Sequence, residues 1–174
     1  AEIIVRGLPI GLGSCAQWDL RLDSRLAGAL MAIPSAKGVE VGSGFDSSSR
    51  RGSEVHDAIL YTPGSDPARK HFHRPTNNAG GIEGGMTNGE DVVLRVAVKP
   101  ISTLNQPLRS VDVATKKKTE AMVERTDNCV VPAVAVIGEA VAALVLADAF
   151  LQKFGADNLE ETKRNFDSFC DTEY

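Results

Sequence analysis

One lysine and two hydroxyl side chains stand together at the end of an apolar run. The segment Lys99-Pro100-Ile101-Ser102-Thr103 follows directly on "DVVLRVAV". An ammonium group and hydroxyls are suitable donors for an anionic ligand such as a phosphate, and the proline fixes the backbone φ between them. An ordinary strand end with the same residues explains the pattern equally well, so the sequence leaves both interpretations open.

A second group of charged residues comes just before a long apolar segment. Glu124, Arg125 and Asp127 lie within four positions of one another. An arginine there can bind a phosphate or carboxylate in bidentate fashion, and an aspartate can hold a proton or orient a base. The alternative is a helix N-terminus that Asp127 or Asn128 caps. Cys129 is expected to be a small buried hydrophobe.

Glycines are concentrated in residues 77–90, "NNAGGIEGGMTNGE". Their spacing matches neither GxGxxG nor GxxxxGK[ST], which excludes a Rossmann or P-loop nucleotide site. Glycine costs backbone entropy and is kept where φ is positive or where another group approaches the backbone closely. The segment is therefore either a structural turn or a loop that contacts a ligand.

Histidine and cysteine give weaker signals. His71 and His73 form an HxH pair, with His56 and Asp57 nearby, but no third ligand stands at a known spacing, so no metal site is predicted. No GxSxG nucleophile motif is present. The cysteines are odd in number and widely spaced, which predicts reduced thiols and a cytoplasmic location: Cys15, Cys129 and Cys170.

Apolar periodicity and turn residues predict the elements that position these groups. The first part of the chain is expected to contain a strand at 2–5, a helix at 25–32 that Asp23 or Ser24 caps, a short strand within 37–45, and a long polar loop at 46–76 with a small strand at 58–61. The second part is expected to contain a strand at 92–98, a hairpin at 109–124, a buried helix at 132–153 closed by Gly155, and a final helix at 159–169. Helices and antiparallel hairpins segregate, which favours the α+β class.

Composition narrows the function classes. The 174 residues, of which 43% are hydrophobic, are typical of a single globular domain spanning 1–174. A net charge of −4, with Lys116–Lys118 as the one basic run, argues against nucleic-acid binding. The apolar segment 130–150 carries Glu139 and Asp148, so a core helix is favoured over a membrane span. The chain opens without Met in a predicted strand, which suggests an upstream region.

Four segments in order resemble one known family. They are "RLDSRLAGALMAIPSAKGVEVGSGF", "NNAGGIEGGMTNGE", "RVAVKPIST" and "ERTDNCVVPAVAVIGEAVAALVLADA". In sequence and spacing they are similar to the C-terminal half of chorismate synthase, and the likeness runs from about residue 4 to 165. The resemblance implies a β-α-β sandwich with antiparallel sheets around helices and a homotetramer. It also implies 1,4-anti elimination of phosphate from the small-molecule substrate 5-enolpyruvylshikimate 3-phosphate, giving chorismate, with reduced FMN as cofactor. The charge and composition, for their part, predict no nucleic-acid or membrane partner.

The resemblance also implies roles for individual residues. Asp127 matches the family aspartate near the flavin N5 and is the catalytic candidate. The implied flavin contacts are Pro34, Ser35, Gly84, Lys99, Pro100, Ile101, Ser102, Thr103 and Arg125. The family's two catalytic histidines, its phosphate-binding arginines and an Arg-Ser-rich flavin segment belong to an N-terminal half that this chain lacks, and Thr126 stands where serine is common. The chain alone is therefore expected to be inactive, and the alternative is a non-catalytic flavin- or phosphate-binding module.

Overall fold

The computed structural model describes residues 1–124 and 129–172. In chain order the elements are β1 (Glu2–Val5), α1 (Leu22–Met31), β2 (Ala36–Val41), η1 (Gly44–Ser49), α2 (Gly52–Val55), β3 (Leu60–Tyr61), η2 (Pro67–Arg69), β4 (Phe72–His73), β5 (Ile82–Glu83), β6 (Met86–Thr87), β7 (Val92–Val98), β8 (Arg109–Val111), β9 (Lys118–Glu120), α3 (Val131–Phe154) and α4 (Leu159–Asp171).

The central strand of the main sheet is β7, which pairs antiparallel with β1 on one side and β2 on the other. Its side chains alternate: Val92, Leu94 and Val96 are buried, whereas the residues between them are more exposed. This period of two is the pattern of a sheet with one face on the core. On the opposite face, Arg95 pairs with Glu2 at 2.8 Å.

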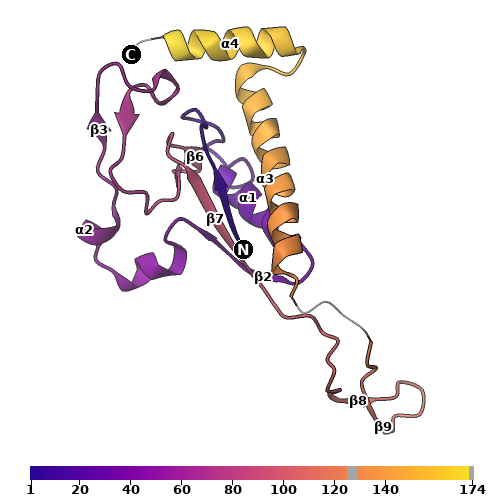
Figure 1. The fold of residues 1–174 in the computed structure, drawn as a ribbon. Helices are drawn as coiled ribbons and strands as arrows, with labels where there is room; N and C mark the ends of the chain where they lie inside the picture. The colour runs from indigo at the N-terminus through magenta and orange to yellow at the C-terminus, as the bar shows by residue number, and fades with distance from the viewer. Residues whose placement is uncertain (125–128, 173–174) are drawn as a thin grey trace.

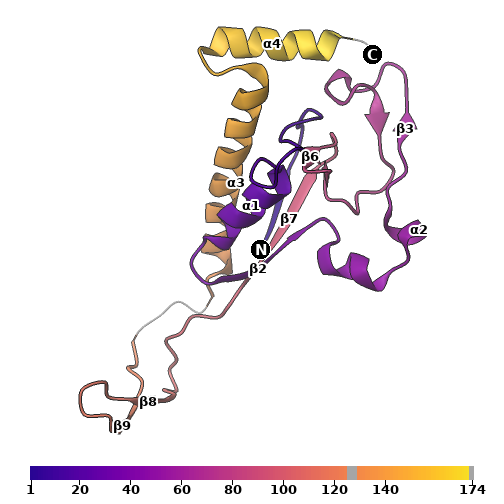
Figure 2. The ribbon, with the colours of Figure 1, turned by 180° about the vertical axis from the view of Figure 1, so that it is seen from behind.

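Two helices, α1 and α3, cover the core face of this sheet (Figures 1 and 2). Leu22, Leu26 and Leu30 are fully buried and recur at helical spacing along α1. In α3, Gly138 allows close approach to β1, since a Cβ there would lie 3.0 Å from the Cδ1 atom of Ile3. The two helices are also joined by an ion pair between Arg25 and Asp148.

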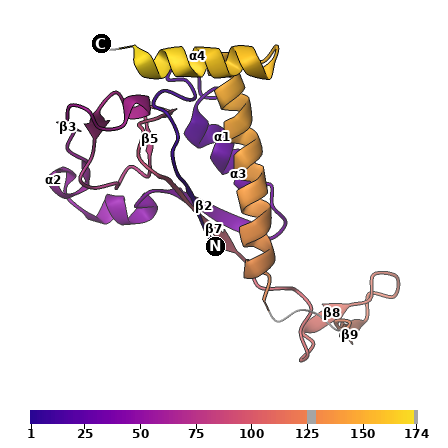
Figure 3. The same ribbon diagram turned by 45° about the horizontal axis from the view of Figure 1, so that its top comes forward.

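The remaining elements lie around this core. The segment 46–76 contains most of η1, the short helices α2 and η2, and the small β3–β4 hairpin, which pairs Leu60 with His73. The β8–β9 hairpin lies on an arm that projects away from the sheet and helices (Figure 3). Helix α4 crosses the far end of α3 and ends near β3 and β4 (Figures 1 and 3).

The sequence predictions for this architecture are largely confirmed. The fold is α+β, the strand at 92–98 has the predicted bounds, and the helix at 131–154 begins and ends within one residue of the prediction. The predicted cap of α1 is wrong. The helix begins at Leu22 after Arg21, with no side-chain cap, because the Asp23 carboxylate pairs with Arg21 and accepts the Ser24 N–H instead.

The prediction that α3 is a buried core helix needs correction. One face packs on the sheet and α1, but Val136 is 67% exposed and Leu144 is 73% exposed. Of the 18 most apolar consecutive residues of α3, only 28% are buried. By length and composition alone α3 is long and apolar enough to cross a membrane, a property that it shares with the core helices of soluble proteins.

Candidate functional site

Two of the segments predicted to contact a flavin meet at one end of the sheet. The backbone N–H of Lys99 donates to the carbonyl of Ser35 at 2.9 Å, one residue beyond the pairing of Val98 with Ala36. Ser35 has a φ of 72°, in the left-handed region that residues other than glycine rarely adopt. The exit of α1 at Pro34 and Ser35 and the strand tip at Lys99 therefore form one continuous surface.

The donors on this surface are free to bind a ligand. Lys99 and Ser102 are exposed, and Thr103 is half-buried. Within residues 1–124 and 129–172, the side chains of these three residues have no hydrogen-bond or ion-pair partner. The ammonium of Lys99, whose backbone is bonded to Ser35, and the two hydroxyls that follow it can bind an anion without first breaking side-chain contacts.

Most glycines of the 77–90 segment are explained by packing within the chain. The backbone at Gly80 crosses the backbone at Gly42 so closely that a Cβ on either residue would lie 2.2 Å from a backbone atom of the crossing segment. Gly81 approaches the carbonyl of Asp91, and Gly85 approaches Arg21 and the carbonyl of Ser14. The structural interpretation of the glycines therefore accounts for these three positions of the loop.

Gly84 differs from its neighbours. It lies in the turn between β5 and β6 with a φ of 60°, and a Cβ there would meet nothing within 4 Å. Its backbone is open to the surroundings, and glycine is needed for the backbone angle rather than for space.

Gly84 and Lys99 are not brought together within one chain. Gly84 precedes the first residue of β7, whereas Lys99 follows the last, and the seven residues of β7 at about 3.3 Å each span roughly 23 Å. Figure 1 shows β6 beside one end of β7 and the arm with β8 and β9 leading away from the other end. The expectation of one shared pocket for Gly84, Lys99 and Arg125 is therefore not met by Gly84 and Lys99 within a single chain.

Arg125 and Asp127 lie outside the described residues. The arm that follows the strand tip pairs with itself through β8 and β9. Cys129 is exposed, so the expectation that it is a buried hydrophobe is wrong. It lies before the first residue of α3 and therefore does not pack with the buried side of that helix.

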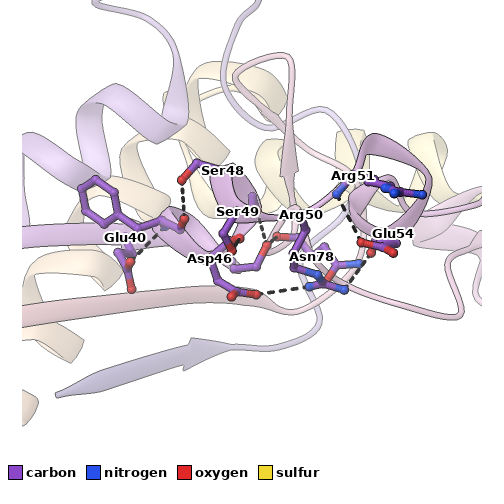
Figure 4. Close-up of polar contacts among 12 residues, drawn as sticks. Glu40, Asp46, Ser48, Ser49, Arg50, Arg51, Glu54 and Asn78 are labelled. Atoms are coloured by element: carbon purple, nitrogen blue, oxygen red, sulfur yellow. Dashed lines mark hydrogen bonds and ion pairs between the residues drawn. The ribbon is translucent and has the colours of Figure 1, made fainter.

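The serine- and arginine-rich segment before α2 is braced by its own contacts (Figure 4). Arg50 contacts the carboxylate of Asp46 at 3.3 Å and donates to the backbone carbonyl of Glu54 at 2.8 Å. The backbone N–H of Arg51 donates to the Glu54 carboxylate at 3.2 Å. The guanidinium of Arg50 is therefore bound within its own segment, and the backbone of Arg51 is bound to Glu54 at the start of α2.

Asp57 organises the start of the glycine loop, a role that the sequence did not indicate. Its carboxylate accepts hydrogen bonds from the Thr76 hydroxyl, from the backbone and side-chain N–H groups of Asn78, and from the backbone N–H of Ala79, at 2.6 to 3.0 Å. Burial alone would raise the pKa of Asp57, but the hydrogen bonds from these residues outweigh it and hold the pKa below its usual value.

Replacing Asp57 by Asn is expected to lower the free energy of unfolding at pH 7 by about 1–3 kcal/mol, since the amide cannot accept all four bonds. The folded-state pKa is depressed, so the contribution of the carboxylate is present above its unfolded pKa of about 3.9 and is lost as pH falls through the folded value. Urea denaturation of both proteins between pH 7 and pH 2 should show the difference shrinking at the acid end. A difference that stays constant would contradict this role.

The histidines lie apart from the strand tip. His71 contacts the carbonyl of Ser65 at 3.2 Å through Nδ1 and the ring of Tyr61 edge-on. Among the described residues, no group of three or more His, Cys, Asp or Glu side chains is arranged to hold a metal ion. None of the three cysteines forms a disulfide.

Comparisons with known proteins agree on one family. The model of the family "Chorismate synthase" matches residues 1–151. Chorismate synthase from Geobacter sulfurreducens is 58% identical over 172 residues, which cover 98% of this chain and 44% of that protein. The protein of the same name from Solibacter usitatus is 55% identical over 170 residues, covering 98% of this chain and 43% of its own length.

A solved structure shares the fold. The crystal structure of a chorismate synthase superposes with a TM-score of 0.76 at 41% identity, over 97% of this chain and 40% of that one. This chain thus spans less than half the length of the relatives it matches. By the family match and by the identities over nearly all of its residues, the chain belongs to the chorismate synthase family.

Proposed function

We propose that this chain supplies the flavin-contacting strand tip and the catalytic aspartate of a chorismate synthase. The reaction is the 1,4-anti elimination of phosphate from 5-enolpyruvylshikimate 3-phosphate to give chorismate, a carbon–oxygen lyase reaction that depends on reduced FMN. The observation that carries the proposal is the junction of Lys99 with Ser35, which presents unpaired donors at one end of the sheet. We further propose a cytoplasmic location.

The strand tip fits the chemistry of the cofactor. FMN is an anion with a planar ring, and the tip offers an exposed cation, two hydroxyls and a half-buried apolar side chain at Ile101. Ser35 and Lys99 are linked through the backbone, so their spacing is fixed before any ligand binds. In this proposal Pro34, Ser35 and the segment 99–103 hold the flavin together with Arg125.

In this proposal Lys99, Arg125 and Asp127 each have one task in the reaction. Reduced FMN, when bound, would supply electron density at the reacting centre. The ammonium of Lys99 and the guanidinium of Arg125 offset negative charge in the site, and the carboxylate of Asp127 holds a proton beside the flavin. The histidines and phosphate-binding arginines of the family are assigned to polypeptide that this chain does not contain.

Gly84 enters the proposal from a second copy. Within one chain it lies at the opposite end of β7 from Lys99, yet its open backbone suits close approach by a ligand. A homotetramer, which the family resemblance implies, would allow Gly84 of one copy to contact the flavin that the strand tip of another copy holds.

The alternative is a non-catalytic module that binds flavin or phosphate. It is favoured by one observation, that more than half of each matched relative has no counterpart in this chain. The module would bind FMN without accelerating phosphate release in any context.

Replacing Lys99 by Met is expected to weaken FMN binding by roughly 10- to 100-fold, the usual effect of losing a charge-assisted hydrogen bond. The measurement is a fluorescence titration of FMN into a chimera in which this chain replaces the matching 44% of the Geobacter sulfurreducens protein. The matched control is Lys118→Met, an exposed lysine on the arm, which should leave the affinity unchanged. Equal FMN affinities for the Lys99 variant and the parent chimera would contradict the proposal that the strand tip contacts the flavin.

A further inference from the structure

A buried lysine from the polar loop lies at the end of the C-terminal helix. Lys70 is only 7% exposed. Its Nζ donates to the backbone carbonyl of Phe169 and, at 2.9 Å, to that of Thr172, with a longer contact of 3.5 Å to the carbonyl of Cys170. The same Nζ lies 4.1 Å from the centroid of the Phe169 ring.

Helix α4 needs such a partner at its C-terminus. The last carbonyls of a helix have no intrahelical donor and carry partial negative charge. The last turn of α4 contains no basic residue of its own, so the cation comes from a residue 99 positions earlier in the chain. Helix α4 also packs on α3, since the rings of Phe166 and Phe169 lie 5.3 and 5.5 Å, centroid to centroid, from the ring of Phe154.

The backbone around Lys70 is held in a conformation that side-chain-bearing residues rarely adopt. Lys70 has a φ of 53° and His71 a φ of 63°, two left-handed residues in succession. In this turn the backbone N–H of Lys70 donates to the backbone carbonyl of Pro67, and the backbone N–H of His71 donates to that of Asp66. Such strain persists where surrounding contacts maintain it, so docking of α4 and closure of the turn stabilise each other.

A cavity of about 240 Å³ lies between the β3–β4 hairpin and the end of α4. Its lining includes Tyr61, Lys70, Phe72 and Cys170. Burial raises the pKa of the Cys170 thiol, although the positive charge of Lys70 acts in the opposite direction. Because Cys170 is half-buried at the end of α4, its accessibility reports on whether this end of the helix stays docked on the hairpin.

We propose that α4 is a strap that Lys70 fastens across this cavity. In the closed state, the ammonium on the helix carbonyls holds the β3–β4 hairpin against α4. Release of this contact frees the last turn of α4 and the hairpin together and uncovers the side of the cavity that Cys170 lines. The device is separate from the strand tip at residues 99–103, which lies at the other end of β7.

The test is alkylation of the 174-residue chain by iodoacetamide, followed peptide by peptide by mass spectrometry. Cys15 and Cys129 are exposed and serve as internal references. Lys70→Met is expected to accelerate modification of Cys170 about tenfold relative to them, because the opened state becomes more populated. Loss of the nearby cation would by itself raise the pKa of the thiol and slow the reaction, so acceleration indicates opening.

The matched control is Lys163→Met, another lysine of α4, which is exposed and should leave the Cys170 rate unchanged. Lys70→Arg, which keeps the cation, should restore most of the protection. Hydrogen exchange of the unaltered chain provides a test that needs no variant: amides of residues 60–73 and 166–172 should share one opening free energy. An unchanged Cys170 rate in Lys70→Met, or separate opening of the two segments, would overturn the proposal.

Discussion

Asp127→Asn in the chimera is expected to lower the rate of chorismate formation by roughly 10²- to 10⁴-fold, the usual contribution of a positioned acid–base group. The affinity for FMN should change little, because the amide has nearly the shape of the carboxylate and Arg125 and Lys99 remain. This separation of rate from binding distinguishes a residue that handles a proton from one that only holds the cofactor. Rate and affinity are measured on the same preparation, under anaerobic conditions with reduced FMN.

Asp19→Asn is the matched control for this substitution. Asp19 is exposed, and the same change of charge there should leave both rate and affinity as they were. If Asp127→Asn kept a rate within a few fold of the parent, the assignment of the catalytic aspartate would be wrong, even if the chimera bound flavin normally.

Gly80→Ala is expected to have the largest effect on stability. The new methyl group would lie 2.2 Å from the backbone nitrogen of Gly42, so the two crossing segments would have to separate. Together with the unfavourable φ of 64°, the clash should lower the free energy of unfolding by roughly 3–6 kcal/mol. Urea denaturation followed by circular dichroism measures the change.

Gly64→Ala isolates the contribution of the clash. Gly64 has a similar φ of 75°, but a Cβ there would meet nothing within 4 Å. That variant should lose only the cost of the backbone angle, about 1–2 kcal/mol. Equal losses for the two variants would mean that the crossing at Gly42 and Gly80 is not tightly packed.

The sequence predicted those elements whose determinants lie within a few residues. The alternation from Val92 to Val98, the length of α3 and its C-cap at Gly155 required no knowledge of distant contacts. The prediction for the start of α1 failed because Asp23 has two uses, as a cap or as a partner of Arg21, and composition cannot choose between them.

The contacts that join distant segments could not be predicted. Asp57 binds Asn78 across 21 residues, and Lys70 reaches the end of α4 across 99. No spacing rule relates such positions, and a polar loop with no apolar period carries no signal of its partners. The same holds for the strand tip: its residues suggested an anion site, but the left-handed turn at Ser35 that completes the surface has no mark in the sequence.

The exposed side of α3 follows the same logic. An Ala- and Val-rich segment with two acidic residues predicts a buried helix, but burial depends on how much polypeptide is present to cover it. In this chain one face is covered and Leu144 is 73% exposed. The matched relatives are more than twice as long as this chain. The sequence pattern therefore predicted an apolar helix correctly, but it did not predict that one face of the helix is exposed in this chain.

Formation of chorismate from 5-enolpyruvylshikimate 3-phosphate and reduced FMN, compared between the chimera and the 174-residue chain alone, tests the central claim most directly. Turnover by the chimera, with none by the chain alone, is the predicted result. A chimera that folds, binds FMN and yet releases no phosphate would contradict the claim and leave the chain a binding module.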